Sequence, residues 1–227
     1  MIDRRRFIVS TAAALTALGL KGLASVNQGL KFSAAENFSF DGLIERARTL
    51  SGRPYGPIPA PPDDVLNKID YEALEKISFK TEYALFAAGR SPYPVTFFHM
   101  GKFSRQPVRM HLLEDAPNGT VSREIRYDES YFDVPPDSPA HALSKGAGFA
   151  GFRFQETKLG DQAKLDWHKN DWVSFLGASY FRGIGELYQY GLSARGIAVD
   201  VAVPDRPEEF PILPTSTLHQ KSPIAIS

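Results

Sequence analysis

Residues 174–200 read SFLGASYFRGIGELYQYGLSARGIAVD and place two arginines among aromatic and small residues. Both ends of this stretch belong to short segments rich in β-branched and aromatic residues, which is the pattern of β-strands. The chain contains six such segments, at residues 95–100, 108–113, 121–127, 149–156, 172–181 and 193–203. Because no helical pattern separates them, they favour an antiparallel sheet or sandwich over βαβ units. We therefore predict a mainly β fold, an antiparallel β-sandwich preceded by short helices.

The region before the first of these segments predicts the short helices. Apolar residues recur at helical spacing over residues 41–50, and Gly52 is a suitable stop. Residues 53–62 are rich in Pro and Gly and predict a loop. A short helix is expected over 63–69, and Asp70 is a good N-cap for another that runs through residue 77.

Turn signals divide the strand-rich region. Asn118-Gly119 lies between two predicted strands and indicates a hairpin. Residues 130–145 contain three prolines and predict a long surface loop. Residues 146–151 are rich in Gly but open no helix, which argues against a phosphate-binding loop.

The N-terminus carries the pattern of an export signal. Arg4, Arg5 and Phe7 stand directly before an apolar stretch over residues 8–20, which is too short for a transmembrane helix. The Arg-Arg-x-Phe sequence resembles the twin-arginine motif that an export machinery reads as an address. We predict a twin-arginine signal peptide over residues 1–35, the twin-arginine export machinery as a partner, and no stable membrane span in the mature protein.

Composition excludes several classes of function. The formal net charge is zero, so nothing in the charge favours nucleic acid as a partner. The chain has no cysteine, and its five histidines are scattered without the spacing of zinc ligands. We therefore expect no metal and no cofactor.

The stretch quoted first also supplies the candidate binding residues. We expect Arg182 and Arg195 to lie buried, where an unpaired charge is costly, so each must be paired or bound to a polar group. Tyr180, Tyr188 and Tyr190 offer rings and hydroxyls to a ligand. Two interpretations stay open: core tyrosines with structural ion pairs, or a polar patch that lines a sugar groove.

Carboxylates are the candidates for catalysis. Glycoside hydrolysis needs two of them across a sugar bond, about 5–10 Å apart. The candidates are Glu156, Asp161, Asp166, Asp171, Glu186 and Asp200. Each is also typical of a solvated turn or a salt bridge. Nucleophilic catalysis is disfavoured because the chain has no Gly-x-Ser-x-Gly elbow, and Ser174, Ser179 and Ser193 have no identifiable His partner.

Several longer motifs carry a resemblance to a known family. They are FFHMG (97–101), VRM (108–110), REIRY (123–127), GFAGFR (148–153), VSFLGASYFR (173–182) and YGLSARGIAVD (190–200). In this order and spacing they resemble the osmoregulated periplasmic glucan biosynthesis proteins of types G and D, from about residue 38 to 210. The twin-arginine start is more similar to type D.

The resemblance implies a periplasmic location and a role in making the β-1,2-linked glucan backbone. It implies a galactose-mutarotase-like β-sandwich followed by a smaller immunoglobulin-like domain, and similarity to inverting β-1,2-glucan hydrolases. The β-glucan polysaccharide is then the expected partner. The residues in matching motifs that we expect to line or support the groove are Tyr180, Arg182, Tyr190, Ser193 and Arg195. The family's catalytic carboxylates are expected beyond the end of this chain, so no catalytic residue is assigned.

Three regions are expected along the chain: the signal over 1–35, the N-terminal part of the large glucan-processing sandwich over 36–210, and a divergent tail over 211–227. The tail, ILPTSTLHQKSPIAIS after Pro211, shows no strand alternation and suggests a frameshift that truncated the gene. A truncated chain is expected to be inactive as an enzyme. The alternatives are a non-catalytic glucan-binding or assembly module, and a product left unfolded by its unpaired sheet edges.

Overall fold

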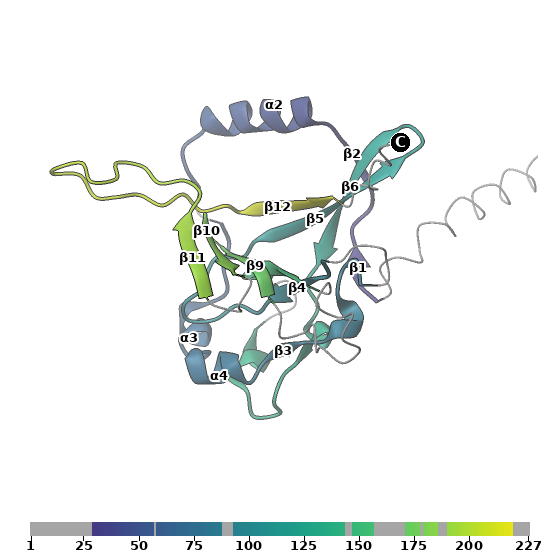
Figure 1. Cartoon of the computed structure of the whole chain (residues 1–227), viewed down its shortest axis with the longest axis vertical. Helices are drawn as coiled ribbons and strands as arrows, with labels where there is room; N and C mark the ends of the chain where they lie inside the picture. Colours follow the sequence, from purple (N-terminus) through teal and green to yellow (C-terminus); the bar gives the residue numbers. More distant parts are fainter. Residues whose placement is uncertain are drawn as a thin grey trace, which may run out of the picture.

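The computed structural model describes residues 29–56, 58–87, 93–143, 147–156, 171–177, 179–185 and 190–219. The predicted export residues Arg4, Arg5 and Phe7 lie outside the described residues, as do Tyr188 and several of the candidate carboxylates. The described part is mainly β, with two five-stranded sheets, a two-stranded ribbon and a few short helices (Figure 1). The prediction of a mainly β, antiparallel fold is confirmed.

The first five-stranded sheet is built around a long hairpin. Its strands are β1 (Lys31–Phe32), β2 (Glu36–Phe38), β5 (Arg109–Ala116), β6 (Gly119–Arg126) and β12 (Thr215–His219). They run in the order β1-β6-β5-β12, and β2 also pairs with β6. The predicted hairpin is confirmed, but its turn lies one residue earlier, because Ala116 pairs with Gly119 across Pro117-Asn118. Gly119 has φ of 119°, a conformation that glycine adopts without a steric penalty.

Strand β12 is the part of this sheet that the sequence pattern missed. It lies in the tail over 211–227, where no strand alternation was found, and it pairs in parallel with β5 from Thr215 to His219. Leu218 is its one buried residue, 4% exposed, and it joins the main core. A single apolar anchor produces no alternating pattern, so the strand depends on its distant partner β5.

The second five-stranded sheet contains the family-like motifs. Its strands are β4 (Val95–Phe98), β8 (Gly151–Gln155), β9 (Asp171–Leu176), β10 (Tyr180–Ile184) and β11 (Tyr190–Arg195), all antiparallel, in the order β11-β10-β9-β8-β4. The predicted strand over 172–181 is two strands, because the chain turns after β9 at Gly177, which has φ of 51°. The predicted strand over 193–203 ends at Arg195, and the residues that follow form the long extension seen beside β11 in Figure 1.

The hydrophobic core lies between the two five-stranded sheets. Phe97 of β4 is 1% exposed, and its ring lies 5.6 Å from that of Phe79 and 4.6 Å from that of Phe149. Met110 and Ile125 enter the same cluster from the hairpin of the other sheet. The two sheets therefore form a β-sandwich whose inner faces share one aromatic-rich cluster.

The helices lie mostly where the sequence placed them. They are α2 (Phe40–Ser51), α3 (Asp63–Leu66) and α4 (Tyr71–Glu75), with the 3-10 turns η1 (Thr81–Tyr83), η2 (Glu129–Tyr131) and η3 (Pro139–Ala142). The predicted N-cap Asp70 accepts a hydrogen bond from the Ala73 amide at 3.0 Å. Helix α2 buries none of its residues and stands apart from the core, above β12 in Figure 1.

The prediction of a surface loop over 130–145 is wrong. This segment contains the end of η2, strand β7 (Phe132–Asp133) and η3, and β7 pairs with β3 (Ser78–Phe79). Tyr131 is fully buried, and its hydroxyl accepts a hydrogen bond from the Lys31 amide at 2.7 Å. Prolines predict that the backbone is irregular, but they do not predict that it lies on the surface.

The buried ring of Phe97 gives a test of this packing. We expect Phe97→Ala to lower the free energy of unfolding by about 3–5 kcal/mol, because it removes an aromatic side chain from the centre of the core. The matched control is Phe103→Ala, since Phe103 is 71% exposed and should change stability by less than about 0.5 kcal/mol. Urea unfolding of the three proteins measures both values, and equal losses for the two variants would contradict the packing.

Candidate functional site

A row of polar side chains crosses all five strands of the second sheet. The residues that pair directly across neighbouring strands are Thr96, Arg153, Ser174, Arg182 and Ser193. Successive side chains of a strand point to opposite faces, so the neighbours of this row, such as Phe97 and Phe152, face the core instead. The sheet thus has an aromatic inner face, and an opposite face that carries this polar row beside the apolar side chains of Phe98 and Leu176. We call this opposite face the polar face.

Exposure changes along the row. Thr96 on β4 is 1% exposed and the Arg153 side chain is 26% exposed, whereas Arg182 and Ser193 are exposed. Strand β11 is an edge strand of this sheet, and among the described strands only β10 pairs with it. The polar face therefore has a covered end at β4 and β8 and an open end at β10 and β11.

At the covered end, Arg153 is held from three sides. Its Nε donates to the Thr96 hydroxyl at 3.0 Å, and its Nη1 forms an ion pair with Asp171 at 3.2 Å. The guanidinium also lies over the Phe98 ring, 5.2 Å from the ring centroid. A guanidinium fixed in this way is a preorganised group rather than a freely moving charge.

At the open end, three predicted site residues form one hydrogen-bonded group. The Tyr180 hydroxyl donates to Ser193 Oγ at 3.1 Å, and Arg182 Nη2 donates to the Tyr180 oxygen at 3.2 Å. The hydrogen bonds with Ser193 and then with Arg182 favour the phenolate, so the pKa of Tyr180 is lowered from its ordinary value. The group presents a guanidinium and two hydroxyls to solvent on one face of the sheet.

Arg195 lies beside this group. Its Cα pairs with that of Tyr180, and its guanidinium stacks on the Phe210 ring, 3.8 Å from the centroid. The expectation that Arg182 and Arg195 are buried is wrong, since both are exposed. The reason is their position at the open end, where β11 has no further strand beside it.

The structure brings together four of the five predicted site residues. Tyr190 begins β11 and its backbone pairs with Ile184, but its side chain lies outside what the structure describes. Sequence reasoning did not select Arg153 as a site residue and did not connect Asp171 with it, although both belong to this face. Their connection depends on strand register, which only the paired sheet reveals.

Among the described residues, the candidate carboxylates Asp171 and Asp200, together with Ser179, are engaged in other contacts. Asp171 is paired with Arg153, and Asp200 lies 3.5 Å from Arg206. The Ser179 hydroxyl donates to the Ile197 carbonyl at 2.7 Å, which ties β10 to the extension after β11. The other carboxylates named earlier, apart from Glu156, fall outside the described residues.

A cavity of about 300 Å³ adjoins the open end of the polar face. Its lining includes Tyr180, Phe103, Arg105, Gln106, Leu176 and Ile212. Phe103 is exposed, so its ring is available for contact with a ligand. The Oε1 atom of Gln106 is buried and has no hydrogen-bond partner among the described residues.

Two further kinds of feature are absent from the described part of the chain. That part holds no cluster of three or more His, Asp or Glu side chains suited to a metal ion. It also holds no helix that is long and apolar enough to cross a membrane.

Comparison with protein families gives a match that covers most of the chain. Residues 38–225 match the family described as "Periplasmic glucan biosynthesis protein, MdoG". This match includes β12 and most of the tail over 211–227.

Individual relatives agree with the family match. The chain is 59% identical over 213 residues to glucans biosynthesis protein D 2 of Ralstonia nicotianae, an alignment that covers 93% of this chain and 39% of the relative. It is 38% identical over 198 residues to glucans biosynthesis protein G of the same organism, covering 86% and 36%. It is 34% identical over 223 residues to glucans biosynthesis protein D of Xylella fastidiosa, covering 93% and 38%. The chain thus spans less than two fifths of the length of each of these relatives.

The ionisation of Tyr180 tests the hydrogen-bonded group. We expect one tyrosine to form its phenolate below the ordinary pH range, because Ser193 and Arg182 stabilise the ionised oxygen. Ultraviolet titration of tyrosinate in the wild type and in Tyr180→Phe isolates this residue by subtraction. Arg182→Gln should move its ionisation back to higher pH, whereas Arg48→Gln on α2 should not. Identical titrations of wild type and Tyr180→Phe at the low end of the range would show that the group does not exist in solution.

Proposed function

The chain belongs to the periplasmic glucan biosynthesis protein family MdoG, and from this premise we propose that its polar face binds a β-1,2-linked glucan. Its location is the periplasm, and its role lies in periplasmic glucan biosynthesis. The observation that carries the proposal is the group of Tyr180, Arg182 and Ser193 at the open end of this face.

The chemistry of the open end suits a sugar chain. Each sugar hydroxyl both donates and accepts hydrogen bonds, and the group offers a guanidinium that donates and two hydroxyls that do both. Arg195 adds a second guanidinium beside Tyr180. An exposed aromatic ring at Phe103 offers an apolar surface for the carbon face of a sugar.

The geometry of the sheet suits an extended ligand. Neighbouring strands are about 4.8 Å apart, so the row from Arg153 on β8 to Ser193 on β11 spans about 14 Å across the polar face. A linear glucan laid across the strands would meet polar side chains at regular intervals. We propose that the residues at β10 and β11 contact it directly, and that Arg153 supports the row from the covered end.

Hydrolysis would require more than these residues supply. It needs two carboxylates about 5–10 Å apart, one on each side of the sugar bond. Among the described residues of the polar face the carboxylate is Asp171, and Arg153 holds it in an ion pair. We therefore assign to this face the binding of the glucan, and we assign no catalytic residue.

Substitution of Arg182 tests glucan binding. We expect Arg182→Ala to weaken binding of linear β-1,2-glucan about tenfold or more, because a charge-assisted hydrogen bond is worth about 1.5–3 kcal/mol. The control is Arg48→Ala, which removes an exposed arginine from α2 and should leave affinity unchanged. Isothermal titration calorimetry of the full chain measures both. Equal affinity of the two variants for the glucan would contradict the assignment of this face.

We further propose that the twin-arginine export machinery delivers the chain to the periplasm. Support comes from Arg4, Arg5 and Phe7 directly before an apolar stretch, which are outside the described residues. Replacing Arg4 and Arg5 together by lysine keeps the positive charge but removes the motif, so we expect the protein to remain in the cytoplasmic fraction. The control is Lys21→Arg, which should be exported normally. Undiminished export of the double variant would show that another route is used.

A further inference from the structure

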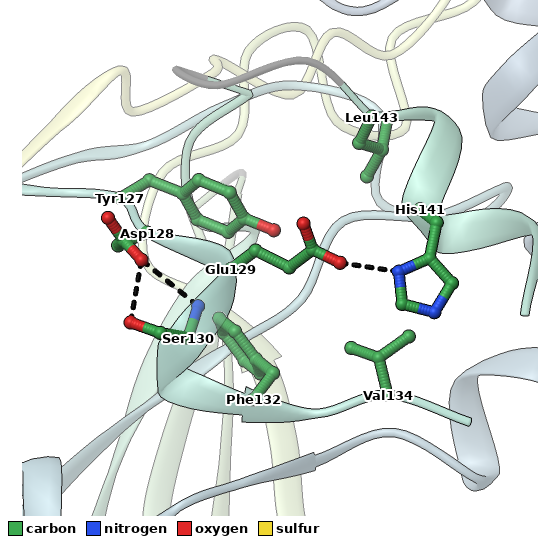
Figure 2. Close-up of a pocket in the computed structure, with 8 residues that line it drawn as sticks. All are labelled: Tyr127, Asp128, Glu129, Ser130, Phe132, Val134, His141 and Leu143. Atoms are coloured by element: carbon green, nitrogen blue, oxygen red, sulfur yellow. Dashed lines mark hydrogen bonds and ion pairs between the residues drawn. The ribbon is translucent and has the colours of Figure 1, made fainter. Parts of the chain in front are cut away.

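A second cavity lies away from the residues assigned to the glucan. It has a volume of about 550 Å³, a size typical of small-molecule sites, and it lies between η2 and η3 (Figure 2). Its lining consists of Tyr127, Asp128, Glu129, Ser130, Phe132, Val134, His141 and Leu143. None of these residues belongs to the polar face.

The apolar part of the lining is firmly placed. Phe132 and Leu143 are 4% and 8% exposed, and the Tyr127 ring lies 5.9 Å from that of Phe132. Val134 completes this side of the cavity, below Glu129 and His141 in Figure 2. A ligand would therefore rest an apolar body on aromatic and aliphatic side chains.

The Tyr127 hydroxyl already donates a hydrogen bond to another side chain of the protein, His99. The Met100 carbonyl lies 2.8 Å from His99 Nδ1, and because a carbonyl only accepts, Nδ1 carries the proton of this ring. Burial lowers the pKa of His99, so the ring is neutral and its Nε2 accepts from the Tyr127 hydroxyl at 3.1 Å. The oxygen of Tyr127 is left as an acceptor.

The polar hydrogens of the His141 and Ser130 side chains are also engaged in hydrogen bonds within the protein. Both ring nitrogens of His141 face acceptors, Nδ1 toward Glu129 at 2.5 Å and Nε2 toward the Pro135 carbonyl at 2.9 Å. The ring donates to both as an imidazolium, and these bonds raise its pKa. The Ser130 hydroxyl donates to Asp128 at 2.6 Å. Lys31 neutralises Asp128 but does not line the cavity. The described lining therefore has side-chain acceptors to offer and no free side-chain donor.

Two of these acceptors converge. Figure 2 shows the second carboxylate oxygen of Glu129 and the hydroxyl oxygen of Tyr127 directed toward the same space beneath Leu143. A ligand that satisfies both must bring hydrogen-bond donors. An ammonium group supplies several N–H donors at once, and its charge is favoured by the remaining carboxylate oxygen and by the aromatic faces. An anion would meet no free side-chain donor in the described lining.

From this arrangement we propose that the cavity binds a small organic cation, an alkylammonium whose N–H groups reach Glu129 and Tyr127 while its carbon chain packs on Phe132, Val134 and Leu143. This site is independent of the glucan proposal, since it shares no residue with the polar face. Binding here can therefore fail while glucan binding holds, and the reverse is also possible.

The test uses the full chain and n-butylammonium chloride as the probe. Isothermal titration calorimetry should show that n-butylammonium binds more tightly than 1-butanol, and that butyrate does not bind. Equal binding of 1-butanol and n-butylammonium would reduce the site to an apolar cavity and overturn the proposal, as would tighter binding of butyrate. Binding of glucose here in preference to the ammonium would also overturn it.

Variants locate the probe. Glu129→Gln keeps the shape of the side chain but removes its charge, and it should weaken n-butylammonium binding about tenfold or more. Tyr127→Phe keeps the ring, removes the acceptor, and should weaken binding by a smaller factor. The matched control is Glu114→Gln on β5, which should bind the probe as the wild type does. Thermal melts confirm that each variant is folded, and wild-type affinity in a folded Glu129→Gln would overturn the proposal.

Discussion

The alternation of side chains across the second sheet sets the register of its strands and the composition of both its faces. One set of residues, such as Phe97, Phe152 and Phe175, faces the aromatic core, and the other set forms the polar face. Because the period of a strand is two, a slip of one residue would exchange the sets and bury guanidinium groups among phenyl rings. The core therefore fixes the register, and the register aligns Arg153, Ser174 and Arg182.

The same constraint gives the polar face its two different ends. Near β4 the row is covered, and Arg153 is immobilised by Thr96, Asp171 and the ring of Phe98. Near β11 the sheet ends, so the group around Arg182 remains open to solvent. This surface has a fixed inner end and an accessible outer end, so a ligand can approach the outer end without displacing the core.

The cavity between η2 and η3 depends on a different part of the sandwich. Its residues follow β6, and their irregular backbone is held by buried Tyr131 and by the pairing of β7 with β3. Asp128 caps η2 and Pro139 begins η3, and the cavity lies between these two 3-10 turns. The protein thus presents two chemically distinct surfaces, one rich in arginine donors and one composed of acceptors.

Features that depend on near neighbours could be predicted from the sequence. They are the helix capped by Asp70, a hairpin next to Asn118-Gly119, the β-type segments and the family motifs, and four of the five site residues predicted from those motifs do lie together. The parallel pairing of β12 with β5, the exposure of Arg182 and Arg195, and the burial of Tyr131 could be seen only in the folded chain. These depend on which distant segment lies alongside, since hydrogen bonding between strands and exclusion of water are set by partners that are far away in the chain.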